Sequence, residues 1–316
     1  MSAVTNIWYG ALVNAEWVDV THGGKLAQLR SGLRLFGKAR RHDQIITSEG
    51  RTGPIGMVVL LLLLVATRQR KLVLMEFLPG TKRGLGRLVR LVYRAALHRA
   101  CLGIQVMTAP EREQYTSEYN IPLGLLKVIP FYFVDDGVVP EPDTAPRHGV
   151  LSSGRQSCDW DTLIDSVLGQ HWDVTMVCSR TAAVRYGSRA TSAGIRVLVD
   201  IPLEEHDDLL ATAALYVLPL TTSSVSSGQT RLMSAMSYRT PTIASEVVGI
   251  AGYERLATRL VPAGNAQALR EAIAGALGDQ GSLRAEMRVA SSLALTRTRS
   301  IYTAEVETFL RGTIRR

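Results

Sequence analysis

The sequence predicts an α/β protein built from two domains, each with a parallel sheet. Short apolar runs typical of buried strands alternate with stretches of helical period along most of the chain. A chain of 316 residues usually forms two domains. Residues 131–147 hold four acidic residues and three prolines, and the alternation restarts after them. This composition is typical of a linker, so the boundary is predicted there.

The resulting organisation has four parts. An N-terminal domain is predicted at residues 1–137, a linker at 138–146 and a second domain at 147–298. Residues 299–316 are expected to form a C-terminal helix that packs back on the N-terminal domain. A cleft between the two domains is the expected binding site, because ligands commonly bind at domain interfaces.

The helices and strands of the first domain are predicted from the spacing of apolar residues along the chain. Strands are predicted at residues 44–47, 71–77, 104–108 and 127–130, and helices at 25–41, 55–66, 83–99 and 111–119. In the second domain, strands are predicted at residues 149–152, 174–178, 195–199, 215–218, 242–245 and 258–261. Its helices are predicted at 160–168, 204–213, 231–239, 266–277 and 283–294, followed by the C-terminal helix at 300–311.

Composition limits the class of protein and its partners. Hydrophobic residues make up 46% and charged residues 20% of the chain, which excludes a disordered protein. The three cysteines, Cys101, Cys158 and Cys178, form no CxxC pair, so neither a zinc site nor a disulfide framework is predicted. No signal peptide is predicted either, and a reducing, cytoplasmic compartment is expected. The formal charge of +8 favours an anionic partner: a nucleotide, a phospholipid surface or a nucleic acid.

The most apolar segment is residues 55–66, IGMVVLLLLLVA. It is too short to cross a bilayer, which needs roughly 20 apolar residues. A buried helix between two strands is expected, and shallow insertion into a membrane is the alternative.

Residues 83–99 form a basic amphipathic helix. Arg83, Arg87, Arg90, Arg94 and His98 fall at helical spacing on one face. No acidic residue lies between residues 77 and 110, so this face suits an anionic membrane. It predicts peripheral contact with the inner face of the membrane; a solvated helix packed on a sheet is the other interpretation. A nucleic acid is not the expected partner, because the helix carries a single aromatic residue and so offers no stacking platform.

Residues 215–252 read as strand, polar loop, helix and strand. Residues 228–230, Gly-Gln-Thr, precede the predicted helix. A helix N-terminus presents unpaired N–H groups and a positive dipole end, which favour phosphate. One more βαβ unit of a core is the other interpretation. The chain has no GxGxxG, GxxxxGK[ST], GxSxG or HExxH pattern, which excludes the common dinucleotide, P-loop, hydrolase and zinc-protease sites.

Four segments in the second half carry a family resemblance. They are SSGR at residues 152–155 with DWDTL at 159–163, SGQT at 227–230 with LMSAM at 232–236, TPTIAS at 240–245 with Gly249, and VPAGN at 261–265 with Ala268 and Leu269. In this order they resemble the donor-binding domain of GT-B-fold retaining glycosyltransferases, of the family 4 or glycosyl transferases group 1 type. The first half is similar in layout only.

The resemblance implies a fold and a reaction. The fold is GT-B, with two Rossmann-like domains facing across a cleft. The reaction is that of a hexosyltransferase, which moves a sugar from a nucleotide diphosphate sugar to an acceptor hydroxyl with retention. The acceptor is expected to be lipid-linked, a polysaccharide or a secondary metabolite. Neither a metal nor another cofactor is expected, because cations and helix-terminal N–H groups can stabilise the departing diphosphate.

The resemblance also assigns residues. Arg155 is predicted to be a catalytic cation on the diphosphate. Glu76 is predicted to be an acceptor-side base or hydrogen-bond acceptor, with a helix cap or salt bridge as the other interpretation. The predicted donor-binding residues are Gly154, Arg155, Ser227, Gly228, Gln229, Thr230 and Ser234.

Three positions depart from the family pattern. Ser226 and Ser234 stand where members often carry two glutamates, and Cys158 or a neighbour stands where a basic residue is common. Each change is expected to weaken donor binding by about 1–3 kcal/mol, the range for a lost hydrogen bond to a charged group. The alternative function is therefore a catalytically impaired homologue that acts as a partner or binding protein.

Overall fold

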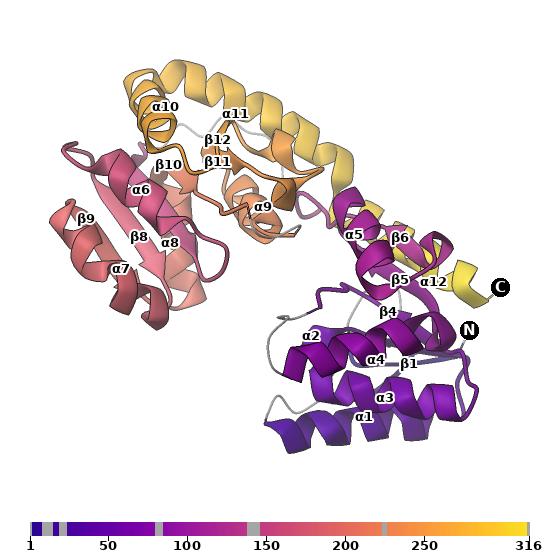
Figure 1. Ribbon diagram of the computed structural model, residues 1–316. Coiled ribbons are helices and arrows are strands. Elements are labelled where there is room, and N and C mark those ends of the chain that lie inside the picture. The colour runs from indigo at the N-terminus through magenta and orange to yellow at the C-terminus, as the bar shows by residue number, and fades with distance from the viewer. Residues whose placement is uncertain are drawn as a thin grey trace. The chain divides into compact units, whose positions relative to one another are not determined.

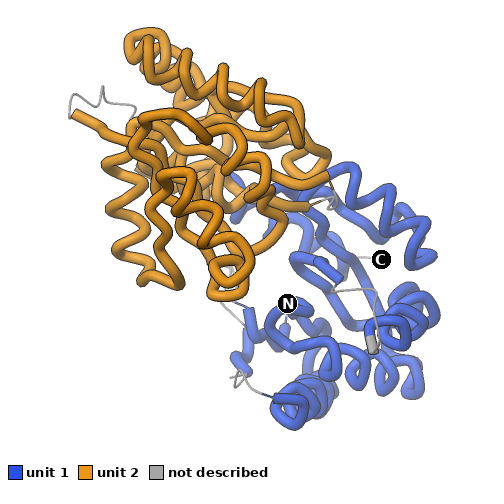
Figure 2. The backbone as a smooth tube through the Cα atoms, turned by 60° about the vertical axis from the view of Figure 1, so that its left-hand side comes forward, with its two compact units in different colours: residues 1–130, 301–316 blue, residues 131–300 orange. Residues whose placement is uncertain are grey.

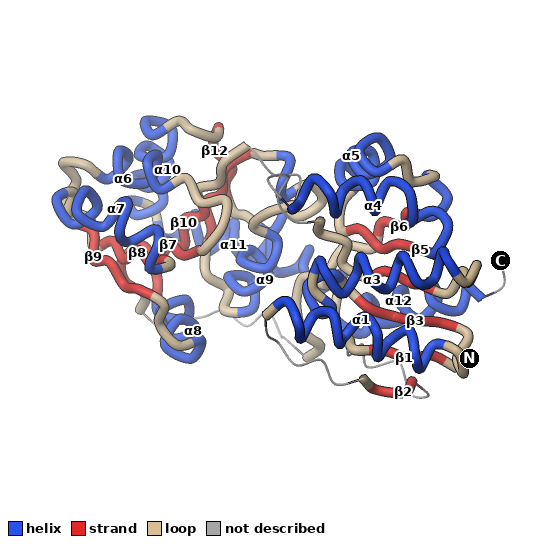
Figure 3. The backbone as a smooth tube through the Cα atoms, turned by 60° about the horizontal axis from the view of Figure 1, so that its bottom comes forward, coloured by secondary structure: helices blue, strands red, loops and turns tan. Residues whose placement is uncertain are grey.

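The computed structural model describes residues 2–7, 15–18, 24–79, 85–137, 146–222 and 226–314 (Figure 1). The chain forms two compact units, residues 1–130 with 301–316 and residues 131–300 (Figure 2). Each unit holds a six-stranded parallel sheet flanked by helices (Figure 3). Residues 138–145 of the predicted linker lie outside the described residues, as do Arg83 and part of the loop before residue 228.

The first unit has the strand order β2-β1-β3-β4-β5-β6. Its strands are β1 (Ala3–Thr5), β2 (Ala15–Trp17), β3 (Gln44–Thr47), β4 (Leu72–Leu74), β5 (Cys101–Val106) and β6 (Leu126–Val128). Its helices are α1 (Lys25–Ala39), α2 (Glu49–Thr52), α3 (Pro54–Ala66), α4 (Leu85–Ala100) and α5 (Ala109–Tyr119), followed by the 3₁₀ turn η1 (Leu123–Leu125).

The apolar segment forms α3, which lies between α1 and α4 (Figure 1). One side of α3 is buried, including Met57, Leu60 and Leu64. Helices α1 and α3 approach closely at two glycines, because a Cβ on Gly32 would overlap the carbonyl oxygen of Gly56. Among the described residues, no helix is both long and apolar enough to cross a membrane.

Helix α12 (Arg299–Ile314) begins at the end of the second unit and continues into the first. It packs on β5, where a Cβ on Gly103 would lie 2.8 Å from side-chain atoms of both Phe309 and Thr313. The buried amide of Gln44 on β3 donates to the Leu310 carbonyl over 2.9 Å. Residues 301–314 are therefore part of the core of the first unit.

The second unit has the strand order β12-β11-β10-β7-β8-β9. Its strands are β7 (His148–Gly154), β8 (Val174–Cys178), β9 (Ile195–Val199), β10 (Ala213–Leu218), β11 (Thr242–Glu246) and β12 (Arg259–Pro262). Its helices are α6 (Trp160–Val167), α7 (Arg180–Ser192), α8 (Leu203–Thr212), α9 (Gln229–Ser237), α10 (Ala266–Gly278) and α11 (Gln280–Ala294). Short 3₁₀ turns occur at Val248–Ile250, Glu254–Leu256 and Leu295–Arg297.

Both faces of this second sheet are covered. Along β10, Leu215 and Val217 belong to one buried cluster, whereas Tyr216 and Leu218 belong to another. Because neighbouring strand residues point to opposite faces, β10 is a central strand packed on both sides. This burial explains why its sequence is continuously apolar.

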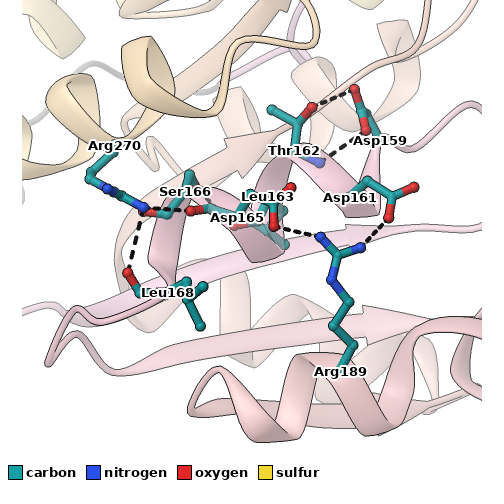
Figure 4. A network of polar contacts seen from close by, with 9 residues as sticks. All are labelled: Asp159, Asp161, Thr162, Leu163, Asp165, Ser166, Leu168, Arg189 and Arg270. Carbon is teal, nitrogen blue, oxygen red and sulfur yellow. Dashed lines mark hydrogen bonds and ion pairs between the residues drawn. The ribbon is translucent and has the colours of Figure 1, made fainter.

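Helix α6 is held at both ends (Figure 4). Asp159 caps its start, since its Oδ1 accepts from the Thr162 amide over 3.1 Å. Arg270 on α10 donates to the carbonyls of Asp165 and Ser166 at its end, over 2.6 and 2.9 Å. Arg189 on α7 pairs with two aspartates of α6 (Figure 4). These contacts fix the loop that joins β7 to α6.

Candidate active site in the second unit

The sheet of the second unit has a switch in strand order between β7 and β10. The chain leaves β7 through α6 toward β8, and leaves β10 through α9 toward β11 on the other side. The two connections therefore diverge at the carboxyl ends of neighbouring strands. In open parallel sheets, ligands bind in the crevice that forms at this point.

Backbone hydrogen bonds join the two diverging loops. The Asp159 amide donates to the Pro219 carbonyl, and the Thr221 amide donates to the Ser157 carbonyl, both over 3.0 Å. These bonds hold the loop after β7 against the loop after β10, so the base of the crevice has a fixed shape.

Helix α9 begins in this crevice. Gly228 is its N-cap and has φ of 89°, a left-handed conformation that favours glycine. Space also requires glycine here, because a Cβ would lie 2.8 Å from Leu220 Cδ1. Gly228 has no side chain to cap the helix. The N–H groups of Gln229, Thr230 and Arg231 at the start of α9 therefore have no capping side chain and point toward the crevice.

The predicted sugar-loop residues have different surroundings. The Gln229 side-chain amide is buried and donates to Ser226 Oγ over 2.9 Å and to the Gly249 carbonyl over 2.7 Å. Its side chain therefore fixes the loop, and only its backbone can meet a ligand. Thr230 is exposed, and Ser234 is half-buried on α9.

Ser227 is buried, yet its hydroxyl has no hydrogen-bond partner among the described residues. An unsatisfied buried hydroxyl costs free energy, and such groups often mark a place that a ligand or water completes. Ser227 stands immediately before Gly228, the cap of α9.

Arg155 follows β7 and extends into solvent, with 73% of its side chain exposed. Within the described part of the chain, its ion-pair partner is Asp200, after β9, with 3.6 Å between Nη2 and Oδ1. An exposed pair at this distance is weak, so the guanidinium is available to an anion.

A second arginine lies in the crevice, and the sequence analysis did not assign it a role. Arg231, in the first turn of α9, donates from Nη1 to the Ser153 carbonyl over 3.2 Å and from Nη2 to the Gln156 carbonyl over 3.1 Å. Nη1 also lies 3.0 Å from Cys158 Sγ. A basic residue at the start of the helix after a predicted phosphate loop was the signal that could have identified it.

Gly154 lies directly against this arginine. A Cβ at residue 154 would overlap both Arg231 Nη1 and Cys158 Sγ. The predicted donor-binding glycine therefore provides space for a guanidinium group. Burial raises the pKa of the Cys158 thiol, although the neighbouring arginine acts in the opposite direction. Cys158 is consequently a neutral thiol at neutral pH.

A buried polar network fixes the end of β7. Ser153 Oγ lies 2.9 Å from the Tyr216 hydroxyl and 2.8 Å from His206 Nε2 of α8. Tyr216 also donates to the Ser153 carbonyl over 3.1 Å. The strand end that carries Gly154 and Arg155 is thereby tied to β10 and to α8.

Glu76 belongs to the first unit, whereas every other predicted site residue belongs to the second. It follows β4 at the carboxyl edge of the sheet and has φ of 48°, a conformation uncommon for residues with a side chain. Its amide donates to Gln105 Oε1 over 3.3 Å. Both interpretations of Glu76, the acceptor-side role and the helix cap or salt bridge, stay predictions.

A cavity of about 820 Å³ also lies in the first unit, between β6 and α12. Its lining is largely apolar and includes Leu102, Leu125, Ile301 and Phe309. Since none of the predicted site residues line it and it offers few cations, it does not suit a diphosphate. Within the described ranges, no group of three or more His, Cys, Asp or Glu side chains could hold a metal ion.

Comparison with known proteins links this site to a family. Residues 162–279 match the family model described as Glycosyl transferases group 1. The segment includes α9 and the loop before it, and ends with α10. No protein of curated function matches the chain significantly.

Solved structures share the architecture at low sequence identity. HepE from Anabaena, solved in complex with UDP, is 15% identical with a TM-score of 0.69, over 95% of this chain and 86% of that one. A glycosyltransferase from Rickettsia africae is 12% identical with a TM-score of 0.66, over 99% and 90% of the two chains. The lipopolysaccharide outer core galactosyltransferase WaaB is 12% identical with a TM-score of 0.58, over 97% and 87%. These matches confirm the predicted GT-B fold, and the family-model match over residues 162–279 confirms the predicted resemblance to glycosyl transferases group 1.

Proposed function

Because the second unit carries a segment of the glycosyl transferases group 1 family, we propose that the chain is a retaining glycosyltransferase. It transfers a hexose from a nucleoside diphosphate sugar to an acceptor hydroxyl. The observation that carries this proposal is the crevice between β7 and β10, at which α9 begins and beside which Arg155 follows the end of β7. The structure of HepE in complex with UDP-glucose supports a UDP-linked sugar as the first candidate donor.

The proposed mechanism follows from where charge develops. The bond from the anomeric carbon to the diphosphate oxygen breaks while the acceptor oxygen bonds to the same face, and the proton of the acceptor hydroxyl passes to the departing diphosphate. Negative charge accumulates on the departing diphosphate, and preorganised donors stabilise it. Arg155 supplies an exposed cation, and the backbone N–H groups of residues 229 and 230 supply fixed donors. Glu76 is proposed to accept a hydrogen bond from the acceptor hydroxyl.

This proposal is tested with a panel of UDP- and GDP-linked sugars. Release of UDP or GDP in the presence of a membrane extract as the acceptor source is expected, and NMR of the product should show the anomeric configuration of the donor. An Arg155→Gln variant is the matched control for contaminating activity. No release from any donor, together with no binding of UDP or GDP, would refute the proposal.

The impaired homologue is the second candidate, and Ser226 and Ser234 motivate it. Ser226 is engaged by the Gln229 amide, so its hydroxyl serves the loop. Ser234 has a single neutral oxygen, so it cannot bind the two hydroxyls of a ribose diol through two charged oxygens, as a carboxylate can. Under this alternative, Ser234→Glu raises nucleotide affinity and creates activity that the natural chain lacks. An active natural chain whose affinity is lowered by Ser234→Glu excludes it.

We also propose that the acceptor is presented at an anionic membrane. Helices α1, α3 and α4 lie side by side and contain no acidic residue (Figure 1). On α4, Leu88 is 58% and Leu91 is 64% exposed, and the exposed Arg87 and Arg94 lie on the same side of the helix. Exposed leucines between cations are typical of helices that lie in a membrane interface.

One of the predicted basic residues of α4 has a structural role instead. Arg90 lies 3.6 Å from Glu118 of α5, between Nε and Oε1, and Glu118 is largely buried. Arginines at helical spacing on one face of a helix repel one another. At Arg90 a carboxylate of another helix relieves this repulsion. Arg87 and Arg94 remain available to a lipid surface.

Flotation with liposomes tests this contact. Wild-type protein should float with vesicles that contain anionic phospholipid, and Arg87→Gln/Arg94→Gln should reduce flotation and its salt sensitivity. Arg90→Gln is expected to lower stability without changing the salt dependence of binding. Flotation that is equal on neutral vesicles at high salt contradicts an electrostatic contact. The predicted cytoplasmic location stays a prediction.

A further inference from the structure

We propose that Arg231 is a second donor-binding residue, whose guanidinium contacts the diphosphate in the crevice after β7. The inference rests on the proposed function and adds a residue of the same site. It also supplies a cation beside Cys158, the position at which the sequence lacks one.

The first observation is the position of the Arg231 side chain. Arg231 starts on α9, after β10, and reaches across the crevice to the loop after β7. Its three contacts there are the carbonyls of Ser153 and Gln156 and the sulfur of Cys158, at 3.0–3.2 Å. The guanidinium is therefore held at the switch point of the sheet, where a ligand is expected.

The second observation is that its charge is not compensated by these contacts. Two of the partners are neutral carbonyls, and the third is a thiol whose pKa is raised by burial. Among the described residues, no carboxylate forms an ion pair with Arg231. A half-buried cation with only neutral partners is costly unless an anion joins it. A diphosphate in the crevice supplies that anion.

The third observation is that neighbouring groups leave space for the guanidinium and add donors. Gly154 has no Cβ where one would overlap Arg231 Nη1. Ser227, just before the α9 cap, has a buried hydroxyl without a partner among the described residues. With the first N–H groups of α9, the crevice then offers a fixed cation and backbone donors, which together match the oxygens of a diphosphate.

A purely structural clamp is the competing explanation, and the chain provides a matched control for it. Arg270 also binds backbone carbonyls, those of Asp165 and Ser166, but at the far end of α6. If Arg231 only holds its loop, Arg231→Gln and Arg270→Gln should act alike: both would lower thermal stability, and neither would distinguish UDP from UMP.

The experiment measures dissociation constants of UDP, UMP, GDP and GMP by calorimetry for the wild type, Arg231→Gln and Arg270→Gln. We expect Arg231→Gln to weaken binding of the diphosphate by about 10- to 100-fold, the range for a lost hydrogen bond to a charged group, and to weaken the monophosphate much less. Arg270→Gln should leave the ratio of the two constants unchanged. Equal weakening of diphosphate and monophosphate by Arg231→Gln would overturn the inference.

A second variant, which places a positive charge at residue 158, shows whether a loss of affinity in Arg231→Gln comes from the missing charge or from damage to the fold. Cys158→Lys in the Arg231→Gln background returns a cation to the same place, since Cys158 Sγ and the guanidinium are in contact. We expect it to recover most of the lost diphosphate affinity, and a double variant as weak as Arg231→Gln contradicts the inference. If the wild type binds neither UDP nor GDP, the proposed function itself fails, which separates that outcome from failure at Arg231 alone.

Discussion

Substitution of Arg155 should separate binding from stability. Its side chain is 73% exposed and its recorded ion pair with Asp200 spans 3.6 Å, so the folded unit gains little from it. Exposed pairs contribute about 0.2–1 kcal/mol, and we expect Arg155→Gln to lower the free energy of unfolding by no more than roughly that amount. A hydrogen bond to a charged diphosphate is larger, at about 1.5–3 kcal/mol, or about 10- to 100-fold in affinity.

The assay pairs thermal unfolding without ligand and calorimetric titration with UDP and GDP. Arg180→Gln is the control, because Arg180 is an exposed arginine at the start of α7, whose amide donates to Asp200 Oδ2 over 3.2 Å. It changes the net charge equally, and it follows β8, whereas Arg155 follows β7. Unchanged nucleotide affinity in Arg155→Gln, or an equal loss in Arg180→Gln, would refute the role of Arg155.

Two further predictions concern stability. Gly32→Ala should destabilise the first unit by about 1–3 kcal/mol, the range for overpacking, because the new Cβ overlaps the Gly56 carbonyl. In Gly37→Ala, on the same helix, the new Cβ meets no atom within 4 Å, so this variant should stabilise the unit by about 0.5–1 kcal/mol. Urea unfolding measures both changes. In the second unit, hydrogen bonds from Arg259 lower the pKa of Glu286 below its ordinary 4.5. A lowered folded-state pKa means that this pair stabilises the unit above pH 4.5, and that the stabilisation is lost as pH falls below 4.5 through the folded value. Arg259→Gln should flatten that part of the pH profile, and a profile as steep as that of the wild type contradicts this.

Much of the fold could be predicted because most of its strands are short apolar runs. The bounds of β3, β8 and β9 agree with the predicted segments to the residue, since each is a short apolar run between turn residues. Strand β4 is shorter than predicted: it ends at Leu74, because the chain turns at Glu76 into a left-handed conformation that the apolar pattern does not reveal.

The elements that were missed bury little. Helix α7 was not predicted, because Ala190 is its one fully buried residue and the helix has no apolar stripe for a periodicity to detect. The edge strand β2 was missed for the same reason, since its residues are half-buried or exposed. Both depend on neighbours in the fold more than on their own sequence.

The site was predicted in part from local order along the chain. The glycine at the α9 cap and the position of Arg155 after a strand are local features, and sequence reveals them. The contact between Arg231 and Cys158 joins residues on two connections that diverge from neighbouring strands. Only the folded sheet brings them together. The sequence alone therefore shows that a basic residue is absent near Cys158, but it does not show that Arg231 lies beside it.

The central claim is that a nucleoside diphosphate binds in the crevice between β7 and β10. Hydrogen–deuterium exchange of the whole chain, with and without saturating UDP or GDP, tests it most directly. We predict slower exchange at residues 153–159 and at residues 226–232 on binding, with little change along α10 and α11. Binding that protects neither segment, or that protects only the first unit, would contradict the account.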